Sequence, residues 1–290
     1  MHELTAEEFR ARLAERPAPP FEPRPMAAVD DLTTPSGALA RVYRPTDAAV
    51  AEPASTPTMV YFHGGGFVIG SVANSDLTAR KLADGIGCTL VSIEYRLAPE
   101  HPFPAAVHDV DEAIAWVAGG GLGHPVHQLF VGGDSAGANL AFVGALHARD
   151  AGIPLVHQLL VYPCVDPAVA SPSHEENGDG YLLTRAGMAW FWRQYLGEDL
   201  ADADHPDANP LLARLHDLPP ATVTTAGFDP LRDEGLEVAA TLARAGTKVT
   251  LLHEPTLFHG FIGYGELVPA AARALGDMCA TVRAALARGV

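Results

Sequence analysis

The stretch from Gln128 to Leu140, QLFVGGDSAGANL, constrains the fold of this chain more than any other segment. It predicts a short apolar strand over Leu129–Val131, a glycine-rich turn with Ser135 at its apex, and a helix over Ala136–Ala148. The turn has the pattern G-x-S-x-G, in which small residues let the strand and the helix approach closely. The serine hydroxyl would then stand at a helix N-terminus, where free N–H groups favour negative charge. Taken alone, the pattern also fits an ordinary glycine-rich turn.

Apolar strands alternate with helices along most of the chain. Further strands are predicted over Ala27–Leu32, Ala38–Tyr43, Thr58–Phe62, Thr89–Ile93, His157–Tyr162, Ala221–Thr225 and Val249–Leu252. Helices are predicted over Ser75–Gly85, over a segment ending near Ala118, over Glu234–Ala245 and over Pro269–Arg288. Continuous apolar strands separated by helices are typical of a mostly parallel sheet that is covered on both faces. The predicted fold class is therefore α/β.

Two segments interrupt this alternation. The N-terminus has a short helix over Leu4–Glu15 and then the proline-rich stretch Pro17–Pro25. The second segment is loop-rich over Ser171–Gly180 and then carries an aromatic helix over Arg185–Tyr195. A polar loop is also expected over Ala48–Pro57. The predicted organisation is an N-terminal cap segment (1–25), a catalytic core (26–165 and 210–290) and a cap insertion (166–209), within the size of one large domain.

A serine hydroxyl needs a base within hydrogen-bonding reach, and the base needs a carboxylate to orient it. In a parallel sheet these partners come from later loops at the same edge, in the order serine, acid, histidine. His259 follows the last predicted strand, and Asp229 follows the strand before it. Asp233 and Glu234 are nearby alternatives for the acid, but they lie where a helix begins, where carboxylates cap the N-terminus. We therefore predict Ser135, Asp229 and His259 as the catalytic residues.

The glycine run Gly64–Gly66 follows an apolar strand and is predicted to hold the other half of the chemistry. Attack on an ester carbonyl creates an oxyanion, which backbone N–H groups stabilise. Glycines have no Cβ, so their N–H groups can approach a ligand closely. The predicted oxyanion hole consists of the amides of Gly64, Gly65 and Ala136.

Charge and composition exclude several classes of partner. The formal net charge of −16 argues against nucleic acid and anionic membranes. No secretory signal and no apolar run long enough to span a membrane is found. The histidines and carboxylates have no four-ligand metal spacing, and no nucleotide-binding motif is present, so neither a metal nor a cofactor is expected. Three cysteines without a disulfide pattern suggest a reducing, cytoplasmic compartment. A homodimer is compatible with the sequence, which does not specify the oligomeric state.

Several motifs in the same order make the chain resemble the hormone-sensitive-lipase-like (bacterial family IV) carboxylesterases of the α/β-hydrolase superfamily. The matching stretches are HGGGFVIGS (63–71), EYRLAPEHPFPAA (94–106), GDSAGANL (133–140), GYLLT with its aromatic helix (180–195), NPLLA (209–213), FDPLRDEG (228–235) and HGF (259–261). The resemblance implies an α/β-hydrolase fold with a small helical cap, and the same triad and oxyanion hole as above. It also implies a preference for short or medium acyl chains.

The resulting hypothesis is a serine carboxylesterase that hydrolyses small-molecule esters through an acyl-enzyme. An amidase or deacetylase with the same triad stays open, as does a non-catalytic small-ligand receptor on the same fold. Four aromatic residues are predicted to line the substrate pocket: Phe67, Trp190, Phe191 and Phe261.

Overall fold

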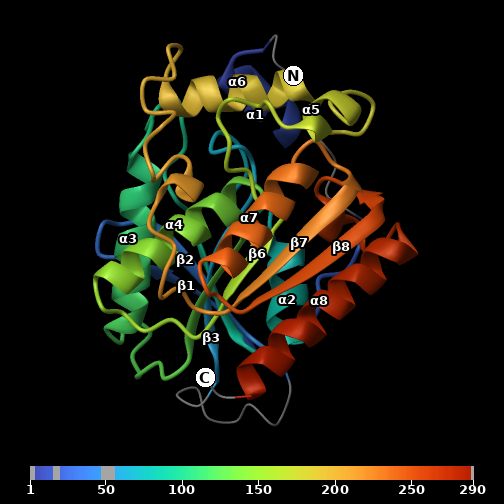
Figure 1. Cartoon of the computed structure of the whole chain (residues 1–290). Helices are drawn as coiled ribbons and strands as arrows, with labels where there is room; N and C mark the ends of the chain where they lie inside the picture. The colour runs from blue at the N-terminus through green and yellow to red at the C-terminus, as the bar shows by residue number, and fades with distance from the viewer. Residues whose placement is uncertain (1–3, 16–19, 47–55, 289–290) are drawn as a thin grey trace.

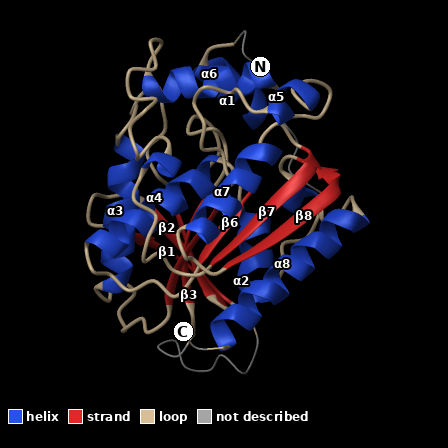
Figure 2. Ribbon diagram, in the orientation of Figure 1, coloured by secondary structure: helices blue, strands red, loops and turns tan. Residues whose placement is uncertain are grey.

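The computed structural model describes residues 4–15, 20–46 and 56–288 (Figure 1). Residues 48–55 of the predicted polar loop and residues 17–19 of the proline-rich stretch lie outside the described residues. The described chain forms one sheet with helices on both of its faces and a further helical layer across one end (Figure 2). The predicted α/β class is confirmed.

The sheet has eight strands in the order β1-β2-β4-β3-β5-β6-β7-β8. Their bounds are β1 Ala28–Thr33, β2 Leu39–Arg44, β3 Thr58–Phe62, β4 Thr89–Ile93, β5 Leu129–Asp134, β6 Gln158–Val161, β7 Ala221–Phe228 and β8 Val249–Phe258. β2 pairs antiparallel with both β1 and β4, and all later pairs are parallel. Parallel neighbours are joined by crossover connections and run in the same direction. The carboxyl ends of β3 to β8 therefore meet at one edge of the sheet.

Helices from distant parts of the sequence cover each face. α2 (Asp76–Ile86) and α8 (Pro269–Ala287) pack on one face and share a core cluster with strand residues. α3 (Ala105–Ala118), α4 (Ala136–Asp150) and α7 (Arg232–Arg244) contribute to the cluster on the other face. β3 and β4, near the centre of the sheet, are buried along their whole length. This two-sided burial explains why their sequences are continuously apolar rather than alternating.

The helical layer across the end of the sheet combines α1 (Ala6–Ala14), α5 (Pro172–Glu176) and α6 (Arg185–Leu196), which lie together at the top of Figure 1. α1 begins with a capping box, because Thr5 accepts from the Glu8 amide and the Glu8 side chain accepts from the Thr5 amide. Phe9 joins α1 to α6, with its ring centroid 6.1 Å from that of Trp190 and 6.4 Å from that of Phe191. α1 is thus packed against a helix that lies about 180 positions further along the chain.

Two elements differ most from the sequence prediction. The stretch predicted as loop contains the short helix α5, which has Pro172 in its first turn, a position where the missing N–H costs nothing. β8 continues past the predicted end at Leu252 as far as Phe258, although Pro255 lies within it. Proline is tolerated there because β8 is an edge strand, and the register shift opposite Ala226 and Phe228 accommodates the irregularity.

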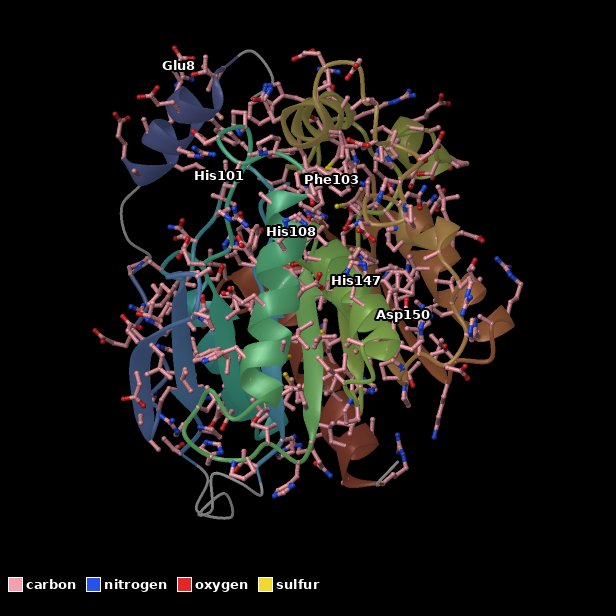
Figure 3. All side chains as sticks on the ribbon, turned by 90° about the vertical axis from the view of Figure 1, so that its left-hand side faces the viewer. Glu8, His101, Phe103, His108, His147 and Asp150 are labelled. Carbon is pink, nitrogen blue, oxygen red and sulfur yellow. The ribbon has the colours of Figure 1, made fainter. Side chains whose placement is uncertain are left out.

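His147 on α4 links the core to the segment that returns from the helical layer (Figure 3). Its Nδ1 lies 2.9 Å from Oδ1 of Asp111 on α3, and its Nε2 lies 2.9 Å from Oδ1 of Asp207. Hydrogen bonds to Asp111 and then to Asp207 raise the pKa of His147 to about 10. Both ring nitrogens therefore donate, and the imidazolium joins three separate segments.

We expect His147→Gln to lower the free energy of unfolding by about 1–2 kcal/mol near pH 6. This is less than the whole pKa shift implies, because solvent reaches a side chain that is 31% exposed. The folded pKa lies above the unfolded value, so the stabilisation is fully present below about pH 6.5 and is lost as pH rises towards about 10. Urea unfolding of both proteins at pH 6, 8 and 10 measures this difference. His127→Gln, at an exposed position, is the control; a difference that does not shrink with pH would contradict the charged pairing.

Candidate active site

Ser135 lies at the turn between β5 and α4, in a strained backbone conformation with φ 56° and ψ −121°. The turn is tight: a Cβ at position 133 would lie 2.1 Å from the carbonyl oxygen of Gly137, and one at position 137 would lie 2.0 Å from that of Phe62. Glycine is therefore required at positions 133 and 137, two residues before and two residues after the serine. The Ser135 amide donates to the Val161 carbonyl oxygen at 2.9 Å, which fixes the turn to β6. Strain of this kind is typical of a nucleophile elbow.

Ser135, His259 and Asp229 form one line of hydrogen bonds. His259 Nε2 lies 3.1 Å from Ser135 Oγ, and His259 Nδ1 lies 2.8 Å from Asp229 Oδ2. Asp229 follows β7 directly and His259 follows β8 directly, so the sheet brings all three to one edge. The tautomer with its proton on Nδ1 satisfies both contacts: it donates to the carboxylate and accepts from the serine hydroxyl. The Asp229 side chain is completely buried, whereas the His259 side chain is 12% exposed.

The carboxylate of Asp229 is held by its own loop and by the helical layer. Its Oδ1 accepts from the Leu231 amide at 2.8 Å. The Asn177 side-chain amide, just after α5, donates to the backbone carbonyls of Gly227 and Asp229. Ser173 of α5 donates to the Pro230 carbonyl oxygen at 2.6 Å. α5 is therefore attached directly to the loop that carries the acid.

The two alternative carboxylates have other partners. Glu234 is buried and accepts from the Val165 and Asp166 amides, and its other oxygen lies 2.7 Å from His174 Nε2. Asp233 accepts from the Ser173 amide at 2.9 Å. Both carboxylates join α5 to α7, which is a structural role different from simple capping.

The loop over residues 63–70 is predicted from the sequence to hold oxyanion donors and is called the oxyanion loop below. The Gly64 amide donates to Oδ1 of Asp134 at 2.9 Å and so already has an acceptor, whereas the sequence predicts that it faces the oxyanion. Asp134, the residue before Ser135, also accepts from the Tyr61 hydroxyl, and its burial raises its pKa. Among the described residues, the amides of Gly65, Gly66 and Ala136 have no hydrogen-bond acceptor.

His63 holds the start of the oxyanion loop in place through its buried ring, which is not available to contact a substrate. Its ring is completely buried and stacks on Tyr95 at a centroid distance of 4.4 Å. Burial lowers the pKa of His63 to about 4, so the neutral ring donates from Nδ1 to the Gly64 carbonyl oxygen at 2.8 Å. The Tyr95 hydroxyl donates to the His63 carbonyl oxygen. The start of the loop is thus fixed before any ligand binds.

The four aromatic residues predicted to line the pocket lie in packed aromatic clusters. Phe67 stacks on Tyr195 at 3.9 Å, and Trp190 and Phe191 contact each other on α6. Phe261 is fully buried and lies 5.5 Å from Tyr162, whose ring in turn lies 4.7 Å from that of His259. The contact of all four with substrate stays a prediction.

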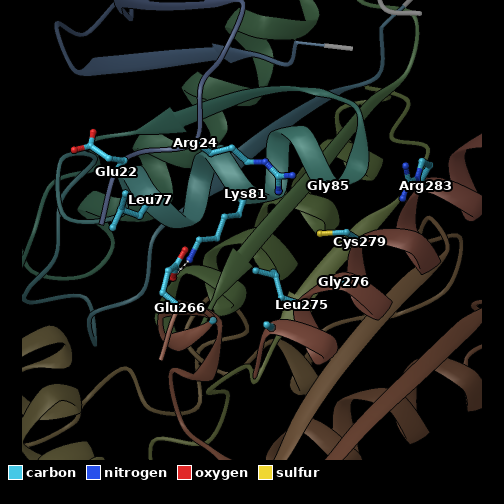
Figure 4. Close-up of a pocket in the computed structure, with 12 residues that line it drawn as sticks. Glu22, Arg24, Leu77, Lys81, Gly85, Glu266, Leu275, Gly276, Cys279 and Arg283 are labelled. Atoms are coloured by element: carbon cyan, nitrogen blue, oxygen red, sulfur yellow. Dashed lines mark hydrogen bonds and ion pairs between the residues drawn. The ribbon is translucent and has the colours of Figure 1, made fainter. Parts of the chain in front are cut away.

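A separate cavity of about 480 Å³ lies between α2 and α8 (Figure 4). None of its lining residues belongs to the hydrogen-bonded line described above. It is bordered by the ion pair between Lys81 on α2 and Glu266, which ties the segment after η4 (Phe261–Tyr264) to the core. Within residues 4–15, 20–46 and 56–288, no group of three or more His, Cys, Asp or Glu side chains is arranged to hold a metal ion.

Comparisons with known proteins agree with the fold. Residues 59–263 match a family model described as the alpha/beta hydrolase fold. The chain is 41% identical to esterase LipI of Mycobacterium tuberculosis over 285 residues, which cover 97% of this chain and 88% of LipI. It is 40% identical to carboxylesterase NlhH of the same organism, covering 96% and 88% of the two chains. The crystal structure of EstE1, a thermostable carboxylesterase from a metagenomic library, superposes with a TM-score of 0.88 at 36% identity and covers 99% of each chain. The chain belongs to the hormone-sensitive-lipase-like, family IV group of α/β-hydrolases.

Proposed function

We propose that this protein is a serine carboxylesterase that hydrolyses short- to medium-chain acyl esters through an acyl-enzyme intermediate. The observation that carries the proposal is the hydrogen-bonded line from Ser135 Oγ through His259 to Asp229. It lies beside backbone amides that have no acceptor among the described residues. Relatives that cover nearly the whole chain are named esterases and carboxylesterases, which supports the same activity.

In acylation, Ser135 Oγ attacks the ester carbonyl carbon while His259 Nε2 takes the hydroxyl proton. The carbon–oxygen bond to the alcohol then breaks, and His259 returns the proton to the leaving oxygen. In deacylation, His259 Nε2 removes a proton from water as the water oxygen attacks the acyl carbon. The bond from the acyl carbon to Ser135 Oγ then breaks, and His259 returns the proton to Oγ as the acid leaves. Asp229 holds the required tautomer and stabilises the imidazolium that forms in both steps.

The oxyanion formed in each step needs donors that are aimed before the reaction begins. We propose that three amides supply them: those of Gly65, Gly66 and Ala136. In this set the Gly66 amide takes the place that the sequence analysis gave to Gly64. Asp134 occupies the Gly64 amide and so ties the oxyanion loop to the residue next to the nucleophile. The helical layer of α1, α5 and α6 acts as a cap over this site. We therefore propose that the cap consists of segments 1–25 and 166–209, as in the sequence analysis.

The preference for acyl chains is tested with p-nitrophenyl acetate, butyrate, octanoate and palmitate. We expect kcat/KM to be highest for acetate to octanoate and to fall sharply for palmitate, because Ser135 is only 6% exposed and leaves little room for a long acyl chain. Equal rates for a matched ester and anilide would instead favour the amidase alternative. Tight binding of a small ligand with no turnover of any ester would favour the receptor alternative, which a complete triad argues against.

We also propose that the protein works in the cytoplasm, because Cys88, Cys164 and Cys279 are all free and buried. None of the described helices has the length and hydropathy needed to cross a membrane.

We propose a homodimer formed through β8, because this edge strand exposes Leu251 and one row of backbone groups. Light scattering that gives the mass of a single chain would reject the dimer.

A further inference from the structure

Arg10 of the N-terminal helix binds directly to the oxyanion loop. Its Nε donates to the Val68 carbonyl oxygen at 2.8 Å, and its Nη2 donates to the Ala98 carbonyl oxygen at 2.7 Å. The same guanidinium forms a bidentate pair with Glu100, at 2.7 and 2.9 Å. One side chain from the start of the sequence therefore joins two loops of the core.

Val68 lies in the same backbone turn as one of the proposed oxyanion donors. The amides of Val68 and Ile69 both donate to the Gly65 carbonyl oxygen, at 3.1 and 2.9 Å. The Ala98 amide donates to the Phe67 carbonyl oxygen at 2.9 Å, so the second loop is fastened to the first. Because the Gly65 carbonyl and the Gly66 N–H belong to one planar peptide group, a shift of Val68 would re-aim the Gly66 amide.

α1 also reaches the loop through a second contact. Phe9, next to Arg10, packs against Phe191 on α6. The Phe191 ring lies so close to Gly66 that a Cβ at that position would be 2.3 Å from it. The polar contact and the aromatic contact therefore hold adjacent parts of the oxyanion loop from the same helix.

The chemistry of these contacts favours arginine. The planar guanidinium presents several donors in a fixed arrangement, so it can bind two carbonyls and a carboxylate together, which a lysine ammonium cannot do with the same geometry. The ion pair itself is partly exposed, with the Glu100 side chain 52% accessible, and contributes little to stability. The hydrogen bonds to the two carbonyls are the part that orders the loops.

We propose that Arg10 is a positioning residue for the oxyanion loop, so that α1 is part of the catalytic apparatus and not only a cover over it. This inference rests on the proposed esterase function. Arg10 does not touch the reacting atoms; it acts through Val68 on the direction of the Gly66 amide. Its effect should therefore appear in the transition state more than in substrate binding.

The test compares Arg10→Gln with Arg12→Gln, which removes an exposed arginine from the same helix. With p-nitrophenyl butyrate, we expect kcat of Arg10→Gln to fall about 10- to 100-fold while KM changes by less than about threefold, since a displacement of about 1 Å can cost a factor of about 100. Affinity for an alkyl boronic acid, which forms a tetrahedral adduct on Ser135 and places an oxygen in the oxyanion hole, should fall by a similar factor. Arg12→Gln should match the wild type in both measurements.

Further variants separate the possible explanations. Arg10→Lys keeps the charge beside Glu100 and is expected to fold normally with intermediate kcat, which covers the case in which Arg10→Gln does not fold. Glu100→Gln removes the ion pair but leaves the carbonyl contacts, so its kcat should stay within about threefold of the wild type. An increase in KM with unchanged kcat and boronate affinity, or no change in Arg10→Gln and Arg10→Lys, would overturn the proposal. A wild type without ester turnover would instead reject the proposed function.

Discussion

Replacing Ser135 by alanine is expected to lower kcat for p-nitrophenyl esters by about 10⁶-fold, because the members of a serine triad act as one unit. The variant keeps the elbow, the oxyanion donors and the cap, and loses only the oxygen that forms the acyl-enzyme. Residual hydrolysis should then come from binding and from the oxyanion hole acting on water. Steady-state kinetics measures the loss, and mass spectrometry with a reactive phosphonate should show one adduct on the wild type and none on the variant.

The control for this variant is Ser36→Ala, which removes a surface hydroxyl that bonds to Glu112 far from the site. Its kcat should equal that of the wild type. Ser135→Ala should also keep the unfolding midpoint of the wild type within a few degrees, since the substitution removes one nearly buried oxygen. Turnover of Ser135→Ala at the wild-type rate would show that another group carries the reaction.

Asp229→Asn is expected to lower kcat by about 10⁴-fold with little change in KM. The Leu231 amide donates to Oδ1 of Asp229, so an asparagine keeps its oxygen there and turns its NH2 group towards Nδ1 of His259, which places the histidine proton on Nε2. Nε2 then points a proton at Ser135 Oγ and cannot accept one. The imidazolium also loses its buried counter-charge. The pH dependence of kcat/KM for both proteins, measured with p-nitrophenyl butyrate, reports the change.

Asp233→Asn is the matched control, because it removes a neighbouring carboxylate that bonds to Ser173 and Arg232 instead of His259. It is expected to keep kcat within about threefold and to lose some stability where α5 meets α7. Combining Asp229→Asn with Ser135→Ala should cost no more than Ser135→Ala alone, because both substitutions disable the same unit. Equal losses for Asp229→Asn and Asp233→Asn would mean that the acid has been assigned to the wrong residue.

Features that depend on short stretches of chain could be predicted from the sequence. The strand Thr58–Phe62 was predicted at its observed bounds, because burial on both faces leaves a purely apolar run. The turn at Ser135 was predicted because close backbone approach admits only glycine at positions 133 and 137. The order of Ser135, Asp229 and His259 followed from the rule that parallel strands end at a common edge. The helix α5 and the end of β8 were missed, since a proline on an edge strand looks like a strand end when its neighbours are unknown.

The sequence by itself determined which elements form, which family the chain belongs to, and which side chains can reach one edge of the sheet. The tertiary structure decided which partner each polar group receives. No local pattern indicated that Asp134 takes the Gly64 amide, that Arg10 binds the Val68 carbonyl, or that His147 lies between Asp111 and Asp207. The physical reason is that hydrogen bonds depend on direction and on distances of about 3 Å, and these are set only when segments from distant parts of the chain have packed together.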